Sequence, residues 1–448
     1  MARPSRKSTF AVVLSFALLS ACQLINNRSA EREAEEAEDR AGRIAMILGD
    51  EVIEANPELA SQTISLPPAV TLTSWAQAGA KPSKVVGHVA AGADFTVDWR
   101  QDAGRGSDRR SALTSPPIAS EESIFVLDSG QTIRAFDLET GAGRWSTKVP
   151  SGNNRDRIGI GGGIAYDSGR VFVSSGFSLI LALDAATGDQ IWRREMDAPM
   201  TGSPTIRDGR MFVTSNNNEV FAINLDDGQV VWSDQAIAEP ARVLGSPSPA
   251  AIEDIVVTPY SSGEVIAYLA TNGRRLWTDA LSRPGRFTPI SAINDIAARP
   301  VLASGLVIVA NQSGITAAID GRTGTRVWVQ PIGSTQAPAL AGTHLFIAGV
   351  DGRLAAIDAA SGGVYWAKDL PKFKNTNKQR GRISYSGPLI ASGHIVLVSS
   401  EGEVLRFDPQ TGEEVGRLDI KQKVFLEPIA VGERIYILTD NARLVAIR

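Results

Sequence analysis

Short apolar runs recur along most of the chain, and glycine, serine, asparagine or aspartate separates each run from the next. Three examples are RVFVSS at 170–175, LILALD at 179–184 and RMFVTS at 210–215. Runs of this length, divided by turn-forming residues, are typical of β-strands joined by hairpins. No stretch in this region has the long 3.6-residue period of an amphipathic helix. The pattern therefore predicts an all-β domain.

A nine-residue anchor with the pattern Asp-x-x-Thr/Ser-Gly-x-x-x-Trp divides these runs into units. Successive copies end 38–51 residues apart, which leaves room for four short strands in each unit. A repeat of this length is the signature of a repeat architecture. The third and fourth copies match the pattern less closely, and the seventh has glycine in place of tryptophan. The copies end at Trp145, Trp192, Trp232, Trp277, Trp328, Trp366 and Gly416.

Each part of the anchor has a local structural role. Aspartate accepts hydrogen bonds from backbone N–H groups two residues on, and glycine takes the left-handed conformation that closes the turn. The tryptophan then enters the outermost strand of its unit, where its large flat ring can fill the wedge between neighbouring sheets. Four-stranded sheets repeated radially form a β-propeller, which protects its edges by closing into a ring.

The two ends of the chain complete the count of blades. The C-terminal stretch 427–448 supplies three strands and no fourth, whereas FTVDWR at Phe95–Arg100 is a strand with Trp99 at the repeat position. We predict an eight-bladed β-propeller of four-stranded antiparallel blades, whose last blade is closed by this N-terminal strand. Trp99 and the six anchor tryptophans would then be equivalent blade-packing residues.

The N-terminus has the features of an export signal. A basic stretch with Arg3, Arg6 and Lys7 precedes an apolar run at 10–19 that is too short to span a bilayer. It ends in LSAC, which resembles the lipobox of bacterial lipoproteins, so we expect a signal peptide at 1–21 and acylation, palmitate included, at Cys22. The alternative for a single cysteine is a small buried residue. Gln23 in place of aspartate favours the outer membrane.

The mature chain then divides into a tether and a folded domain. Residues 29–48 are rich in Ala, Glu and Arg, which indicates a helical or disordered tether over 22–64. The propeller with its lead-in segment is expected over 65–448. The net charge of −4 and the isoelectric point of about 5.6 argue against a nucleic-acid-binding protein.

Candidate catalytic residues do not form a set. His344 and His394 occupy one repeat position that holds arginine in other blades, which predicts solvated turns, and His88 has no spaced ligand partner. The glycine cluster at 159–165 lacks the Gly-Lys-Ser/Thr ending of a phosphate loop. Serines in Ser-x-Pro or Ser-Pro contexts have no nearby histidine and are interpreted as turn residues; they are Ser203, Ser246 and Ser386. The sequence predicts a protein without catalytic residues, cofactor or metal.

The tryptophan repeat resembles that of the pyrroloquinoline-quinone-type propellers, which include quinoprotein alcohol dehydrogenases. Those enzymes carry an adjacent cysteine pair beside the quinone, and Cys22 is the only cysteine of this chain. A quinoprotein dehydrogenase-like or ligand-binding periplasmic propeller remains the alternative.

The lipobox, the repeat and the absence of enzyme residues together resemble the BamB family of outer-membrane β-barrel assembly lipoproteins. The segment SWAQAGAKPSKVVGH at 74–88 resembles the lead-in of alphaproteobacterial members. The resemblance implies a monomeric scaffold within a hetero-complex at the periplasmic face of the outer membrane. It would dock on the POTRA domains of BamA beside the other subunits and assist unfolded outer-membrane proteins.

The family's contact with BamA implies two loops in this chain. One corresponds to ARVLGSPSP, with Arg242, Val243 and Leu244, where the arginine stands one place early; the other corresponds to INDIAARP, with Asp295 and with Ala297 in place of a second acid. Connections from an outer strand to the next inner strand emerge on one face of a propeller, so these loops should be neighbours. A third loop, at 370–384, holds five basic residues and could contact lipid headgroups, peptidoglycan or an acidic partner, or only solvent.

Overall fold

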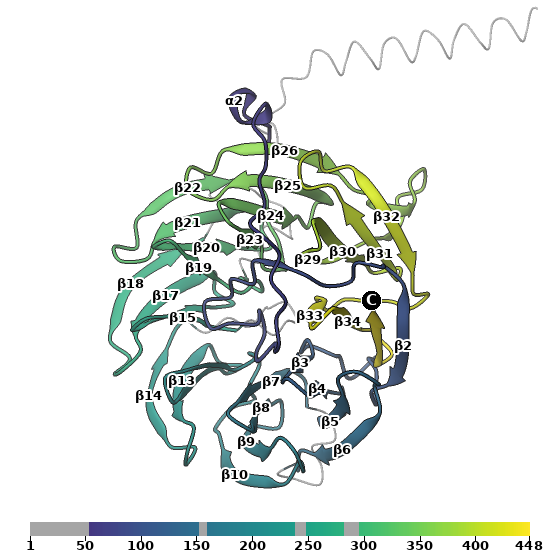
Figure 1. The fold of residues 1–448 in the computed structure, drawn as a ribbon. Coiled ribbons are helices and arrows are strands. Elements are labelled where there is room, and N and C mark those ends of the chain that lie inside the picture. The colour runs from purple at the N-terminus through teal and green to yellow at the C-terminus, as the bar shows by residue number, and fades with distance from the viewer. Residues whose placement is uncertain (1–52, 152–158, 238–247, 282–294) are drawn as a thin grey trace, which may run out of the picture. The chain divides into compact units, whose positions relative to one another are not determined.

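Eight four-stranded antiparallel sheets, arranged as the blades of a ring, make up most of the chain (Figure 1). The computed structural model describes residues 53–151, 159–237, 248–281 and 295–448. Each blade runs from an inner strand at the ring axis to an outer strand at the rim. The predicted all-β fold, an eight-bladed propeller, is confirmed.

The first four blades follow one another along the chain. Their strands, from inner to outer, are β3 (Ile118–Ala119), β4 (Ser123–Leu127), β5 (Thr132–Asp137) and β6 (Gly143–Lys148) in blade 1; β7 (Gly162–Asp167), β8 (Arg170–Ser175), β9 (Leu179–Asp184) and β10 (Gln190–Glu195) in blade 2; β11 (Thr205–Arg207), β12 (Arg210–Thr214), β13 (Glu219–Asn224) and β14 (Val230–Gln235) in blade 3; and β15 (Ala250–Ile252), β16 (Ile255–Pro259), β17 (Glu264–Leu269) and β18 (Arg275–Ala280) in blade 4.

The remaining blades complete the ring, and the last one draws its outer strand from the N-terminal side. They contain β19 (Val301–Ala303), β20 (Leu306–Ala310), β21 (Thr316–Asp320) and β22 (Arg326–Gln330) in blade 5; β23 (Ala339–Ala341), β24 (His344–Ala348), β25 (Arg353–Asp358) and β26 (Val364–Asp369) in blade 6; β29 (Tyr385–Ala391), β30 (His394–Ser399), β31 (Glu403–Phe407) and β32 (Glu414–Asp419) in blade 7; and β33 (Ile429–Val431), β34 (Arg434–Leu438), β35 (Arg443–Ile447) and β2 (Val97–Asp102) in blade 8. The short strand β1 (His88–Val89) pairs in parallel with β29 and extends the inner edge of blade 7. Outside the blades lie the hairpin β27 (Phe373–Asn375) and β28 (Arg380–Arg382), and the short helix α2 (Pro57–Ala60).

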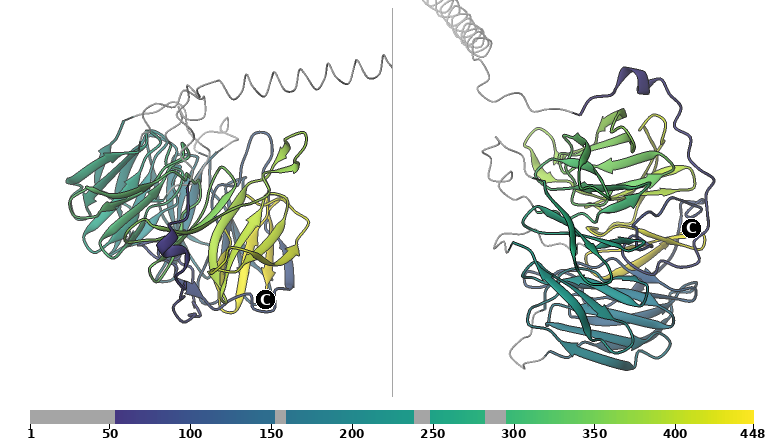
Figure 2. Two further views of the ribbon diagram at one scale, coloured as in Figure 1. Left: turned by 90° about the horizontal axis from the view of Figure 1, so that it is seen from above. Right: turned by 90° about the vertical axis from the view of Figure 1, so that its left-hand side faces the viewer.

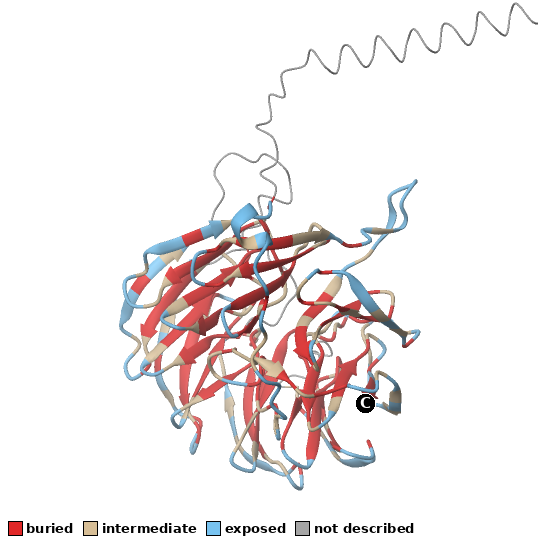
Figure 3. Cartoon of the chain, turned by 45° about the horizontal axis from the view of Figure 1, so that its top comes forward, coloured by how far each residue is buried: buried red, intermediate tan, exposed pale blue. Residues whose placement is uncertain are grey.

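Burial changes systematically from the axis to the rim. The second and third strands, such as β8 and β9, are buried almost throughout because both faces of the blade pack against neighbouring blades (Figure 3). Outer strands such as β6 and β10 instead alternate between exposed and half-buried residues, whereas β26 is buried over Val364–Trp366. The wholly apolar runs therefore mark the middle of each blade, and the polar tryptophan-bearing runs mark its rim.

The ring is closed by pairing between the two ends of the chain. β2 lies antiparallel to β35, with Trp99 opposite Ala446 and Asp102 opposite Arg443. The C-terminal strand thus lies between β34 and the N-terminal strand, as predicted. Because this closure uses backbone hydrogen bonds between segments far apart in sequence, the ring cannot form until both ends are in place.

Seven tryptophans lie at the joins between blades. Each indole Nε1 donates a hydrogen bond of 2.7–3.0 Å to a carbonyl in the Asp-x-x-Thr-Gly turn of the next blade. The glycine of that turn has a positive φ and lies against the indole, so close that an added Cβ would be 2.4–2.8 Å from it. The tryptophan–glycine pairs are Trp99–Gly141, Trp145–Gly188, Trp192–Gly228, Trp232–Gly273, Trp277–Gly324, Trp328–Gly362 and Trp366–Gly412.

The turn that receives the tryptophan is built by its aspartate. In blade 1, Asp137 Oδ1 accepts hydrogen bonds from the backbone N–H groups of Glu139 and Thr140 and from the Thr140 hydroxyl. A hydrogen bond from Arg144, followed by those from Thr140, holds the pKa of Asp137 below its ordinary value. The charged carboxylate of Asp137 therefore stabilises the turn whose glycine, Gly141, packs against the indole of Trp99.

The join between blades 7 and 8 is built differently. Gly416 replaces tryptophan here, and blade 8 has no third-to-fourth-strand turn, because its outer strand comes from the other end of the chain. Instead, the guanidinium of Arg406 lies 3.9 Å from the centroid of the Phe95 ring and donates to the carbonyls of Gly92 and Ala93. The seventh anchor lacks its tryptophan at the one join that offers no turn to receive it.

The lead-in segment crosses one face of the ring (Figure 1, Figure 2). It hydrogen-bonds to the inner strand, or the turn after it, in seven blades, and all of these contacts lie where the inner strand turns into the second strand. The contacts join Trp75 to Ala119, Ala76 to Tyr166, Gln77 to Ile206, Pro82 to Ala251, Ser83 to Leu302, His88–Val89 to Ile390–Ala391, and Leu72 to Gly432. This end of the central channel is therefore covered by the chain's own backbone.

The packed part of the chain begins earlier than expected. We assigned 22–64 to the tether, yet Ile53 and Ile64 are 3% and 7% exposed and join the cores between blades 5 and 6 and between blades 6 and 7. Asn56 N–H donates to Val364 O of β26 at 2.8 Å, next to helix α2. The compact unit thus begins at Ile53 and not at Ser65. Cys22 lies outside the described residues. Within those residues no helix is long and apolar enough to cross a membrane.

Candidate partner-binding face

The face opposite the lead-in is formed by the connections from each outer strand to the next inner strand; we call it the connection face. Both loops implied in partner binding belong to it, since they join β14 to β15 and β18 to β19. The first joins blades 3 and 4, and the second joins blades 4 and 5. Arg242, Val243 and Leu244 lie outside the described residues.

Asp295 is the described member of the implied contact set. It is buried, with 4% of its surface exposed, and its backbone carbonyl accepts a hydrogen bond from Gln312 N–H at 3.2 Å. The next residue, Ile296, donates to the carbonyl of Tyr260. Backbone hydrogen bonds thus fix the base of the connection, and the side chain of Asp295 exposes little surface.

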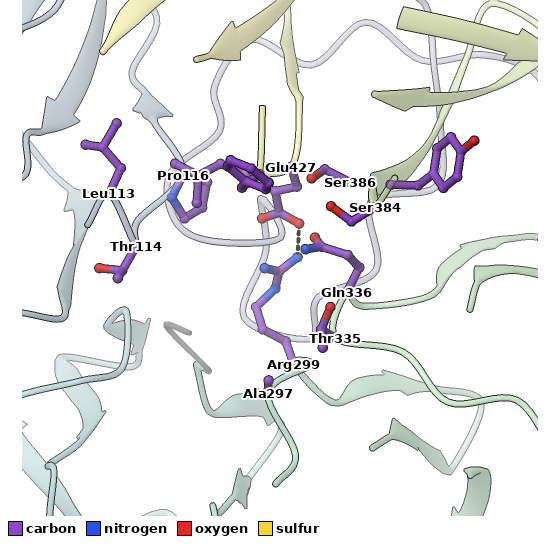
Figure 4. Close-up of a pocket in the computed structure, with 13 residues that line it drawn as sticks. Leu113, Thr114, Pro116, Ala297, Arg299, Thr335, Gln336, Ser384, Ser386 and Glu427 are labelled. Carbon is purple, nitrogen blue, oxygen red and sulfur yellow. Dashed lines mark hydrogen bonds and ion pairs between the residues drawn. The ribbon is translucent and has the colours of Figure 1, made fainter. Parts of the chain in front are cut away.

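The mouth of the central channel opens on the connection face as a pocket of about 250 Å³ (Figure 4). Connections that enter blades 1, 5, 6, 7 and 8 line it. Uncharged hydrogen-bonding side chains surround its centre, and Phe425, 46% exposed, lies at its edge. The uncharged residues are Thr114, Thr335, Gln336, Ser384 and Ser386.

A nearly buried ion pair lies in this pocket. The guanidinium of Arg299, before blade 5, pairs with the carboxylate of Glu427, before blade 8, and each side chain is 12% exposed. Because these residues are distant in sequence, no local motif predicts that they form an ion pair. It links the connections that enter two blades that are not neighbours.

Lys84 of the lead-in lies deeper in the channel. It is 3% exposed, and its ammonium donates to Ala78 O at 2.9 Å and to Thr205 Oγ1 at 2.8 Å. Burial lowers its pKa well below the ordinary value, Arg299 lowers it further, and Glu427 opposes the shift. The lead-in is thus joined to the blades by a polar cluster as well as by backbone hydrogen bonds.

The candidate catalytic residues have structural environments. The prediction of a solvated turn at His344 is wrong: the ring is buried and packs edge-on against Tyr365 at 5.2 Å, beneath the segment that precedes the lead-in, and burial lowers its pKa. His394 is half-buried and bonds the Ser392 carbonyl through Nδ1 at 2.8 Å. His88 Nε2 accepts from Gly393 N–H at 2.8 Å, so its Nδ1 donates to Pro67 O at 2.7 Å.

The other candidates are equally structural. Gly162 and Gly163 begin the inner strand β7, as expected for the glycine cluster. Ser203 is buried and Ser386 lines the pocket, while Ser246 lies outside the described residues. Within the described ranges, no three His, Cys, Asp or Glu side chains gather so that they could hold a metal ion.

The sequence matches the family described as outer membrane protein assembly factor BamB over residues 129–368 and 350–448. The chain belongs to the BamB family. BamB of Yersinia pestis is 23% identical over 357 residues, which cover 78% of this chain and 88% of that protein. BamB of Alteromonas naphthalenivorans is 27% identical over 377 residues, which cover 79% and 87%.

Solved structures agree with the fold of the BamB family. BamB from Moraxella catarrhalis superimposes with a TM-score of 0.66 at 19% identity, covering 79% of this chain and 99% of that one. Quinohemoprotein alcohol dehydrogenase from Comamonas testosteroni gives 0.65 at 12% identity, covering 84% and 81%. At such identities the likeness shows the propeller fold alone.

Proposed function

We propose that this chain is a non-enzymatic scaffold subunit of the machinery that assembles outer-membrane β-barrel proteins. The observation that carries the proposal is the family match, which begins at residue 129 within blade 1 and extends to the C-terminus. In this proposal an acyl group on Cys22 holds the chain at the periplasmic face of the outer membrane. The rigid ring then presents its connection face to a protein partner.

The proposed partner is the set of POTRA domains of BamA. Arg242, Val243 and Leu244 would supply the direct contacts, and Asp295, buried at the base of the neighbouring connection, would hold that connection in shape. Support comes from the topology, since both connections join consecutive blades on a face that the lead-in leaves uncovered. Unfolded outer-membrane proteins are the proposed clients of the assembled complex.

Co-purification from detergent-solubilised envelopes tests the docking. Substituting Arg242→Glu, Leu244→Ala and Asp295→Ala together should abolish recovery of BamA. The control Arg100→Glu/Arg193→Glu changes two exposed arginines on outer strands β2 and β10 and should leave recovery unchanged. Undiminished recovery of BamA by the triple variant would refute the assignment of this face.

The alternative, a quinoprotein, is less compatible with the channel. In a site for a quinone with calcium, several oxygen donors would have to surround the metal. Among the described residues that line the pocket, Glu427 is the only carboxylate, and it is paired with Arg299. The described residues do not fit this cofactor. Titration with the quinone and calcium should therefore produce no new absorption band.

A further inference from the structure

A basic arm extends from the connection face between blades 6 and 7. It consists of residues 370–384, which include the hairpin β27–β28, with Phe373 opposite Arg382 and Asn375 opposite Arg380. Figure 3 shows it as an exposed projection from the ring. It carries five basic residues and no acidic one, in a chain whose net charge is −4; they are Lys372, Lys374, Lys378, Arg380 and Arg382.

The base of the arm is fixed to the propeller. Ile383 N–H donates to Lys372 O at 2.9 Å, and the Tyr385 hydroxyl donates to Pro371 O at 2.8 Å. Arg382 donates to the carbonyl of Val350 in blade 6 at 2.5 Å. A connection with only a spacing role would not need these bonds, whereas a preorganised arm loses little conformational entropy when it binds.

The charges of the arm are paired at its base and unpaired at its tip. Lys372 forms an ion pair with Asp369 at 3.0 Å, and Lys374 pairs with Glu401. Lys378 and Arg380, at the tip, are exposed and form no ion pair with any described residue. The positive charge therefore faces outward, away from the acidic groups of the propeller.

We propose that the tip of the basic arm contacts an acidic surface on the protein partner that docks on the connection face. This inference rests on the proposed function. A protein partner is favoured over lipid headgroups because the arm leaves the ring on the same face as the connections that join β14 to β15 and β18 to β19. Exposed charges of this kind act mainly on the association rate and its salt dependence.

The test compares Lys378→Glu/Arg380→Glu with the control Arg100→Glu/Arg193→Glu, using the full chain in detergent and immobilised POTRA domains. At about 0.1 M salt the tip variant should associate about ten-fold more slowly than the unchanged chain, and the difference should disappear near 1 M salt. The control should bind like the unchanged chain. Lys378→Arg/Arg380→Lys should also bind normally, since it keeps both charges.

Two outcomes would overturn the inference, and a further measurement explains the second. If the unchanged chain fails to bind the POTRA domains, the proposed function fails and the inference with it. If the unchanged chain binds and the tip variant binds equally fast, only the inference fails. In that second case the Cys22→Ser chain is sedimented with phosphatidylethanolamine–phosphatidylglycerol vesicles, with and without the tip substitutions, and the result to look for is a loss of sedimentation when they are present. That result would assign the arm to lipid headgroups.

Discussion

The indole of Trp145 lies directly on Gly188 of the next blade. Its Nε1 donates to Ala185 O at 3.0 Å, and a Cβ built on Gly188 would lie 2.4 Å from Trp145 Cε3. Gly188 also has a φ of +77°. Two independent constraints, backbone conformation and space, therefore require glycine at this repeat position.

Comparison of two glycines separates these constraints. Gly209 has a φ of +72° but open space where a Cβ would point. Gly209→Ala should lower the free energy of unfolding by about 1–2 kcal/mol, the cost of the left-handed conformation. Gly188→Ala should cost about 1–3 kcal/mol more, because the indole must move. Equal losses for both variants in urea unfolding would show that the indole contributes nothing to the requirement.

The missing tryptophan at Gly416 provides a second prediction. A Cβ at this position would meet Phe95 and Arg406 at ordinary distances of 3.5–3.6 Å, so Gly416→Ala should be close to neutral in a thermal melt. Gly416→Trp should destabilise the chain by about 1–3 kcal/mol. The ring would displace the Arg406–Phe95 stack and find no turn to receive it. A stabilised Gly416→Trp variant would contradict this account of the closure.

Trp75 differs from the seven tryptophans at the joins. Its Nε1 is buried and has no hydrogen-bond partner among the described residues, whereas Trp232 Nε1 donates to Ala270 O at 2.9 Å. Replacing Trp232 with phenylalanine leaves this buried carbonyl without its donor, at about 1–3 kcal/mol. Trp75→Phe removes a ring of the same size but no hydrogen bond. We therefore expect Trp232→Phe to lower the melting temperature more than Trp75→Phe does. A larger loss for Trp75→Phe would show that the hydrogen bond at the join is not a source of stability.

Lys84 should make the stability of the lead-in depend on pH. Burial lowers its pKa in the folded chain well below 10.5, and unfolding restores the ordinary value. Between these two pKa values the unfolded chain binds more protons, so the free energy of unfolding rises with pH in that window. From about pH 7 to about pH 10 the melting temperature of the unchanged chain should rise relative to that of Lys84→Met.

The control for this pH dependence is Lys81→Met, which changes an exposed lysine of the same segment. Its melting temperature should follow that of the unchanged chain at every pH. If Lys84→Met does the same, the ammonium of Lys84 is not destabilised by burial.

Much of the fold could be predicted because the repeat is local. The anchor contains its own turn, and the middle strands are marked by continuous apolar runs. Strands β8 and β9 therefore begin and end where the sequence predicted them, and β12 ends one residue before the predicted end. The closing strand could also be predicted, since Trp99 continues the spacing of the repeat. These features depend on residues near one another in the chain.

The errors came from contacts between distant residues. His344 occupies a repeat position that holds arginine in other blades, and its burial beneath residues of the N-terminal segment has no counterpart there. The same segment carries Ile53 and Ile64 into cores between blades, although its composition resembles that of a tether. The composition of a segment indicates its average exposure to solvent. It does not show which of its side chains pack between two blades.

The sequence by itself determined the number of blades, the turn at each join and the position of the tryptophan, because each follows from a short stretch with a fixed spacing. Tertiary structure alone decided how the lead-in covers one end of the channel, and how Arg299 meets Glu427. It also decided that the join between blades 7 and 8 has no turn to receive a tryptophan at position 416. These depend on closing the ring, which brings together groups that no spacing relates.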